Sequence, residues 1–223
     1  MVRLRGKRLA LWEVGMAELP WLPEFERAGR NGEELATDEA AVWKRVLDLR
    51  VARWLGPERI LETHAGLGIG TALFRYACPQ AEVVALGDWR SGDVAGCFGL
   101  VDVDPFGQPW DVLEMVGSRL SADGVLMVSN GEALAVWRNL RRQQRYPTGN
   151  YGKRLPVWVV DEYLPKLEDV TGLEMRFFYA FPSSVRVILS NKKMPAELWE
   201  GCPHWMWWLE RYAEKEQLKF WRV

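Results

Sequence analysis

The sequence predicts an α/β fold in which a mostly parallel sheet ends at one edge in an antiparallel hairpin. Two observations predict it. Short apolar strands alternate with helical segments through the middle of the chain, which is typical of a parallel sheet wound with crossover helices. Near the end, two further apolar strands are joined by the tight connection Pro182-Ser183-Ser184, which indicates a hairpin.

The elements follow from periodicity and from residues that start or stop a helix. Thr37 and Asp38 offer helix caps, and apolar residues then recur at helical spacing until Gly56-Pro57 ends the segment. The expected strands are 59–62, 82–86, 100–104, 124–129, 174–181 and 185–190. The helices expected after the first are about 71–77, 110–120, 133–144, 160–167 and 203–219.

The chain of 223 residues is long enough for one principal domain with appendages. We expect an N-terminal arm over 1–36, the principal domain over 37–191 and a Trp-rich helical appendage over 192–223. No apolar run approaches the roughly 20 residues that span a bilayer. The first residues also lack the long apolar segment of a signal peptide, so we expect a cytoplasmic protein without a membrane partner.

Charge and cysteine content exclude other classes. A net charge of −1 does not mark the chain as a nucleic-acid binder, so any such binding must come from a local patch. Three scattered cysteines, Cys78, Cys97 and Cys202, argue against a disulfide framework. Cys202 and His204 lack a second ligand pair at zinc-like spacing, so no metal site is expected.

A glycine-rich loop leaves the first expected strand, where residues 60–70 read Ile-Leu-Glu-Thr-His-Ala-Gly-Leu-Gly-Ile-Gly. Its glycines let the backbone turn tightly and approach a ligand closely. A dinucleotide fingerprint needs its third glycine where this chain has Thr71, and no Lys-Ser or Lys-Thr follows the loop. The spacing therefore disfavours NAD and nucleoside triphosphates. A glycine turn without a ligand is the alternative.

The loop resembles the first motif of class I S-adenosylmethionine-dependent methyltransferases, in which an acid at the strand end stands three residues before Ala-Gly-x-Gly. The resemblance implies a Rossmann-like methyltransferase fold with S-adenosylmethionine as cofactor. It places Glu62 near the amino group of the cofactor's methionine part. The residues expected at the cofactor are Glu62, His64, Ala65, Gly66, Gly68, Gly70, Asp88, Trp89, Asp93 and Asp102.

The region after the second strand carries the expected nucleoside contacts. Asp88 would accept hydrogen bonds from the ribose hydroxyls, and Trp89 would cover the adenine. The family uses a further acid near the adenine amino group, a position that Asp93 matches. The stretch from Asp88 to the next strand is too short for the usual helix and third strand. We expect a deleted crossover or an abbreviated sheet, and solvated loop carboxylates are the alternative for both acids.

Asp102 and Asp104 alternate in a valine-rich strand that runs into the loop Asp104-Pro105-Phe106-Gly107. Alternate positions share one face, where two carboxylates repel, but ligands bind at the carboxyl ends of parallel strands. The loop resembles the Asp-Pro-Phe-Gly loop of tRNA guanine-N2 methyltransferases. The resemblance implies that Asp104 accepts a hydrogen bond from the target amine, that Phe106 stacks on the base, and that Gly107 allows close approach. A purely structural turn is the alternative.

A basic, aromatic stretch without acids lies between Glu132 and Asp161. Cations for phosphates and rings for bases are what a single-stranded or flipped nucleic acid needs. The candidate substrate-binding residues are Arg141, Arg142, Arg145, Tyr146 and Tyr151. A solvated helix face is the alternative. Just before this stretch, Ser129-Asn130-Gly131 ends a strand at the same edge and could line the target pocket or cap the next helix.

The sequence therefore predicts an N-methyltransferase acting on an exocyclic amino group of a nucleic-acid base, in tRNA or another RNA. A protein side chain or small molecule as substrate is one alternative. A binding protein that keeps the methyltransferase fold without turnover is another. Near the end of the chain stand Trp199, Trp205, Trp207, Trp208 and Trp221. These tryptophans indicate core cover or a homodimer contact more than base stacking.

Overall fold

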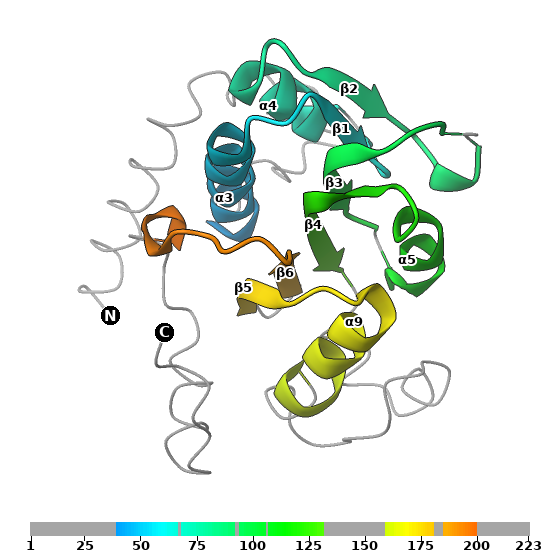
Figure 1. Ribbon diagram of the computed structural model, residues 1–223, viewed down its shortest axis with the longest axis vertical. Coiled ribbons are helices and arrows are strands. Elements are labelled where there is room, and N and C mark those ends of the chain that lie inside the picture. Colours follow the sequence, from blue (N-terminus) through cyan, green and yellow to red (C-terminus); the bar gives the residue numbers. More distant parts are fainter. Residues whose placement is uncertain are drawn as a thin grey trace.

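The computed structural model describes residues 39–66, 68–91, 94–105, 107–131, 159–180 and 185–199. At its centre lies a six-stranded sheet of order β2-β1-β3-β4-β6-β5 (Figure 1). The first four of these strands are mutually parallel, and β6 runs antiparallel to both β4 and β5. The predicted mostly parallel sheet with an antiparallel hairpin is confirmed.

The strands are β1 (Arg59–Glu62), β2 (Glu82–Ala85), β3 (Phe98–Val103), β4 (Leu120–Asn130), β5 (Met175–Ala180) and β6 (Val185–Leu189). The α-helices are α3 (Glu39–Leu55), α4 (Ile69–Ala77), α5 (Trp110–Val116) and α9 (Leu164–Thr171). Three short turns of helix complete the described elements: η2 (Trp89–Ser91), η3 (Val159–Tyr163) and η4 (Ala196–Trp199). Among the described residues, no helix is long and apolar enough to cross a membrane.

Several predicted boundaries were wrong: the strand expected from residue 100 begins at Phe98, and the helix expected over 160–167 continues to Thr171. The helix expected over 110–120 ends at Val116, and β4 begins at Leu120 rather than at residue 124. The reason is tertiary, because Leu120 pairs with Phe98 and the backbone N–H of Phe98 donates to the Arg119 carbonyl. The N-terminal arm and the helices expected over 133–144 and 203–219 lie outside the described residues.

The sheet is shortened after β2, as the sequence predicts. Between β2 and β3, the described residues form only the turn η2, and the two residues left undescribed, 92 and 93, are too few for a strand. The chain therefore passes directly from β2, across β1, to β3. Strand β2 is the edge of the described sheet on the side where the nucleoside half of the cofactor is expected.

Helices cover both faces of the sheet, α3 and α4 on one and α5 and α9 on the other (Figure 1). Each central strand contributes alternate residues to the two faces because successive side chains point to opposite sides. Leu61, Val101 and Leu126 pack with the α5 and α9 side, whereas Leu100 and Val125 pack with the α3 and α4 side. The same alternation sends the polar residues at the strand ends toward α3.

The first residues of the predicted appendage pack against the domain. Trp199, in η4, stacks on Phe177 of β5 with ring centroids 4.5 Å apart and an angle of 5° between the planes. The Leu198 carbonyl accepts a hydrogen bond from Arg50 of α3 at 3.4 Å. Trp199 thus covers the core, which is the first of the two roles predicted for the tryptophans; the others lie outside the described residues.

Candidate active site

The glycine loop connects β1 to α4 at the carboxyl edge of the sheet. Gly66 and Gly68 have φ of +52° and +82°, a left-handed backbone conformation that residues other than glycine rarely adopt. The backbone N–H of Ala65 donates to the Leu86 carbonyl at 2.7 Å, and its carbonyl accepts from Gly68 N–H at 2.7 Å. The first bond ties the loop to the residue after β2, and the second closes a turn within the loop. Among the described residues, no atom lies within 4 Å of the place that a Cβ would take at Gly68.

Glu62 lies beneath this loop and is almost completely buried. The hydroxyl of Thr71, on α4, donates to its Oε2 at 2.5 Å. Gly70 is required here because a Cβ at that position would overlap the Glu62 carboxylate. Burial, and then the negative charge of Asp102, raises the pKa of Glu62 to about 7. Near neutral pH this carboxyl can therefore gain or lose its proton readily.

His64 follows at the start of the loop and is half-buried. Its Nδ1 lies 2.8 Å from the Thr63 hydroxyl, which donates to the backbone carbonyl of Asp102 at 3.1 Å. The single hydroxyl proton is used in the second bond, so Nδ1 of His64 carries a proton and donates to the Thr63 oxygen. Burial lowers the pKa of His64 against the opposing effect of Asp104. The neutral imidazole thus keeps its acceptor lone pair on Nε2.

Asp88 and Trp89 follow β2, adjacent to the glycine loop. Asp88 is exposed, and its Oδ1 accepts a hydrogen bond from the backbone N–H of Arg90 at 3.0 Å. Trp89 is half-buried against the apolar cluster on the α5 side, and the Arg90 guanidinium lies 4.8 Å from the centre of its ring. The structure thus places these two predicted residues next to the loop. Asp93, the other predicted nucleoside contact, lies outside the described residues.

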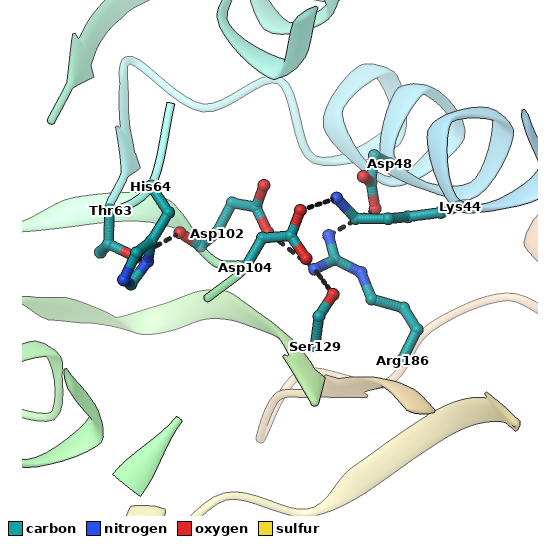
Figure 2. Close-up of polar contacts among 8 residues, drawn as sticks. All are labelled: Lys44, Asp48, Thr63, His64, Asp102, Asp104, Ser129 and Arg186. Carbon is teal, nitrogen blue, oxygen red and sulfur yellow. Dashed lines mark hydrogen bonds and ion pairs between the residues drawn. The ribbon is translucent and has the colours of Figure 1, made fainter. Parts of the chain in front are cut away.

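A buried ionic network joins three strands to α3 (Figure 2). At its centre is Arg186 of β6, whose side chain is 1% exposed. Arg186 Nη1 donates to Asp102 Oδ1 at 2.8 Å and to the Ser129 hydroxyl at 2.9 Å, while Nη2 donates to Asp48 Oδ1 at 2.6 Å. Burial raises the pKa of Asp48 to about 6, although Arg186 and Lys44 oppose the increase. Asp102, predicted at the cofactor, is instead enclosed beside Arg186.

Asp104 lies two residues beyond Asp102, where β3 has just ended. Its carboxylate forms an ion pair with Lys44 of α3 (Figure 2). Burial acts to raise the pKa of Asp104, but Lys44, Arg186 and a hydrogen bond from Ser129 outweigh it and hold the pKa below its usual range. The side chain is nevertheless 36% exposed. Asp104 is therefore an ionised hydrogen-bond acceptor that a ligand can reach.

The residues after Asp104 are anchored to the end of β4. Gln108 and Asn130 exchange two side-chain hydrogen bonds, at 3.2 and 3.1 Å, and Trp110 Nε1 donates to Gln108 Oε1 at 3.2 Å. The Trp110 ring meets buried Tyr163 edge to face, with ring centroids 5.6 Å apart. Pro105 is buried and Gly107 is half-buried within this loop, while Phe106 lies outside the described residues. The loop that begins at Asp104 is thereby held in place at both ends.

Sequence reasoning brought together the glycine loop, Asp88 and Asp104, but it missed Lys44, Asp48 and Arg186. A signal existed for each. Arg186 is the one charge in an otherwise apolar strand. Asp48 stands between Leu47 and Leu49 on the predicted helix, one helical turn after Lys44. The expected substrate contacts Arg141, Arg142, Arg145, Tyr146 and Tyr151 lie outside the described residues.

Comparison with known proteins was informative for structure only. No family model matches the sequence, and no curated protein matches it. Among solved structures, Trm1 from Pyrococcus horikoshii in complex with S-adenosyl-L-methionine aligns with a TM-score of 0.55 and 14% sequence identity. The alignment covers 66% of this chain and 54% of Trm1. The chain has a Rossmann-like methyltransferase fold.

A weaker structural likeness extends over more of the chain. The O-methyltransferase TomG from Streptomyces achromogenes, in complex with SAM, aligns with a TM-score of 0.47 and 13% identity. That alignment covers 83% of this chain and 90% of TomG. By contrast, the chain spans only about half the length of Trm1.

Proposed function

We propose that this protein is an S-adenosylmethionine-dependent N-methyltransferase that acts on an exocyclic amino group of a nucleic-acid base, in tRNA or another RNA. One observation carries the proposal. The ionised, partly exposed carboxylate of Asp104 lies at the carboxyl end of β3, and the glycine loop lies at the carboxyl end of the adjacent strand β1. In open α/β sheets, ligands bind outside the carboxyl ends of the strands.

The residues at this edge fit the proposed cofactor. The glycine loop leaves open space beside Gly68. Glu62 ends β1, and Asp88 stands three residues after Ala85, the last residue of β2 and the partner of Glu62 in the sheet. Glu62 would meet the cofactor's amino group, and its pKa of about 7 lets it ionise when an ammonium group arrives. Exposed Asp88 would accept hydrogen bonds from the ribose, and Trp89 would lie against the adenine. The cofactor supplies an electrophilic methyl group on its sulfonium.

Asp104 has the chemistry of an orienting acceptor. An exocyclic amine is a poor nucleophile while its lone pair is delocalised into the ring. A carboxylate that accepts one of its N–H bonds polarises the amine and directs the lone pair toward the methyl donor. Because the pKa of Asp104 is below its usual range, it binds a proton weakly. We therefore assign Asp104 to orientation and polarisation of the amine and not to removal of its proton.

Two features support a nucleic acid as the source of that amine. The loop Asp104-Pro105-Phe106-Gly107 resembles that of tRNA guanine-N2 methyltransferases, and its Phe106 would stack on the base. The basic, aromatic stretch follows β4, whose end at Asn130 is joined to this loop through Gln108. Its arginines and tyrosines would bind phosphates and bases beside the acceptor.

Calorimetric titration is the first test. We expect S-adenosylmethionine and S-adenosylhomocysteine to bind and NAD not to bind. If neither S-adenosylmethionine nor S-adenosylhomocysteine binds, methyltransferase activity is excluded for any substrate.

Transfer of a tritiated methyl group to bulk tRNA, DNA and protein is the second test. We expect label in RNA, and expect Asp104→Ala to abolish transfer while changing cofactor affinity little. Asp111→Ala, an exposed aspartate on α5, is the matched control and should retain the wild-type rate. Label in protein alone would defeat the nucleic-acid substrate, and an active Asp104→Ala variant would defeat the role given to Asp104.

Nucleic-acid binding is the third test. Charge reversal at Arg141 and Arg142 should weaken RNA binding strongly at low salt, because phosphate contacts dominate affinity there. An unchanged affinity in a filter-binding assay would contradict this role and favour the alternative, a solvated helix face.

A further inference from the structure

Two ionic links connect α3 to the strands that form the proposed site. The inner link runs from Asp48 through Arg186 to Asp102 and is buried throughout. The outer link joins Lys44 to Asp104 and is partly exposed. Lys44 and Asp48 stand one helical turn apart on α3, and Asp102 and Asp104 stand two residues apart along the chain at the end of β3, so each pair presents its side chains in one direction.

Each link supplies a positive charge to one of the two neighbouring carboxylates, Asp102 and Asp104. Asp102 and Asp104 would repel on a shared face, but Arg186 lies against the first and Lys44 against the second. Both contacts between α3 and the sheet, Lys44 with Asp104 and Asp48 with Arg186, join opposite charges (Figure 2). Since Arg186 also binds the Ser129 hydroxyl on β4, α3 is fixed at the same time to β3, β4 and β6.

We propose that Lys44 is a positioning residue of the methyl-transfer site, which holds the Asp104 carboxylate ionised and oriented toward substrate, and that the buried Asp48-Arg186-Asp102 chain fixes the helix that carries Lys44. This inference rests on the proposed function of Asp104. Lys44 acts through Asp104 and is given no contact with the methyl group. Its charge lowers the proton affinity of Asp104, and its ion pair with Asp104 favours one orientation of the carboxylate.

Among the described residues, the charged and titratable groups around Asp104 come from α3, from β1 and its loop, and from β3 and β6. They are Lys44 and Asp48 from α3, Glu62 and His64 from β1 and its loop, Asp102 from β3 and Arg186 from β6. Asp48 and Glu62 have pKa values near 6 and 7, so they contribute to the pH profile of any variant. The ionisation of Asp104 must therefore be measured directly.

The test compares full-length wild type with Lys44→Met, which keeps the length of the side chain and removes its charge, and with Lys44→Arg, which keeps the charge. Carbon-13 NMR of protein labelled at aspartate carboxyls follows Asp104, with Asp104→Asn used to assign its signal. We expect Lys44→Met to raise the pKa of Asp104 by about 1–3 pH units. Lys44→Arg should leave that pKa close to the wild-type value.

The rate of methyl transfer gives the second readout. At saturating S-adenosylmethionine, Lys44→Met should lower kcat about tenfold or more, with a further loss relative to wild type as the pH falls toward the raised pKa of Asp104. The KM for S-adenosylmethionine should not change, and Lys44→Arg should recover most of the rate. Lys166→Met, which removes a lysine from an exposed pair with Asp169 on α9, is the matched control and should behave as wild type.

The possible outcomes separate this inference from the proposed function. If wild type transfers methyl groups but Lys44→Met changes neither the pKa of Asp104 nor the pH profile, the role of Lys44 is overturned and the proposed function stands. If wild type transfers no methyl group to any acceptor, the proposed function fails, and the NMR titration still decides whether Lys44 controls Asp104. If Lys44→Met does not fold, Lys44→Gln is measured against the same expectations.

Discussion

The two faces of the sheet bury their residues in different ways. On the side of α5 and α9, the buried residues of the central strands are uncharged, with Val103 at the end of β3 and Val128 followed by the amide of Asn130 at the end of β4. On the side of α3 and α4, the same strands carry Leu100 and Val125 and, nearer their carboxyl ends, Asp102 and Ser129. The antiparallel strand β6 follows this pattern in reverse, because its charged residue, Arg186, lies near its beginning and hence at the same edge.

The two faces therefore differ in whether they bury charge. Burial of apolar surface stabilises a fold without further requirements, whereas a buried charge costs free energy unless it is paired and hydrogen-bonded. The α3 face accepts that cost at one edge alone, the edge where ligands bind in sheets of this kind. The position of its polar groups is therefore better explained by a site than by the needs of the core.

The largest effect should come from removing the charge at the centre of the network. Arg186→Met leaves Asp48 and Asp102 without their shared counter-charge and should cost about 3–5 kcal/mol of unfolding free energy. Leu189→Met, on the same strand but on the apolar face, changes shape alone and should cost less than about 1.5 kcal/mol. Urea denaturation measures both. Equal losses of unfolding free energy in the two variants would show that the buried charges of the α3 face contribute no more to stability than apolar packing on the other face.

Adding Asp48→Asn to Arg186→Met provides an internal check. Part of the stability should return, because one of the two orphaned carboxylates is removed. No recovery would contradict the assignment of the loss to unpaired charge.

Glu62→Gln should separate stability from cofactor binding. Because the folded-state pKa of Glu62 is raised from its ordinary value of 4.5 to about 7, the folded protein holds this proton more tightly than the unfolded chain does. The stabilisation is present below pH 4.5 and is lost as the pH rises to 7. Glutamine still accepts the Thr71 hydroxyl and has no charge to desolvate. The unfolding free energy of the variant should therefore match that of wild type at pH 4 and exceed it by about 3 kcal/mol at pH 8.

The same variant should bind S-adenosylmethionine more weakly, since it cannot offer a negative charge to the amino group. Glu114→Gln, an exposed glutamate on α5, is the control and should change unfolding free energy by no more than about 0.5 kcal/mol at either pH. A pH-independent difference between wild type and Glu62→Gln would refute the proposed ionisation of Glu62.

The smallest effect should come from a pair of glycine substitutions, one on each side of the sheet. In Gly70→Ala the new methyl group overlaps the Glu62 carboxylate and should cost about 1–3 kcal/mol, with a loss of cofactor affinity. In Gly117→Ala the methyl group lies 3.4 Å from the Leu113 carbonyl at the end of α5, and stability should change by about 1 kcal/mol or less. Thermal unfolding measures the change in stability of each variant, and calorimetric titration measures its affinity for the cofactor. Equal responses would mean that Glu62 moves aside at little cost.

Much of the fold was predictable because its signals are local. The bounds of β1 and the positions of α3, β2 and the hairpin follow from apolar periodicity and from breakers such as Gly56-Pro57. The short stretch after Asp88 was enough to predict the shortened sheet. The end of α5 was not predictable, because Leu120 joins β4 through a pairing with Phe98 that no local pattern records.

The sequence by itself determined the two loops of the candidate site, since the residues of each are consecutive and both loops follow strands of one parallel sheet. Only the tertiary structure decided what neutralises Asp102 and Asp104. Arg186 is 84 positions from Asp102 and 138 from Asp48, and Lys44 is 60 positions from Asp104. A charge in an apolar segment indicates that a partner exists, but the packing of α3 and β6 against the sheet selects which residue that partner is.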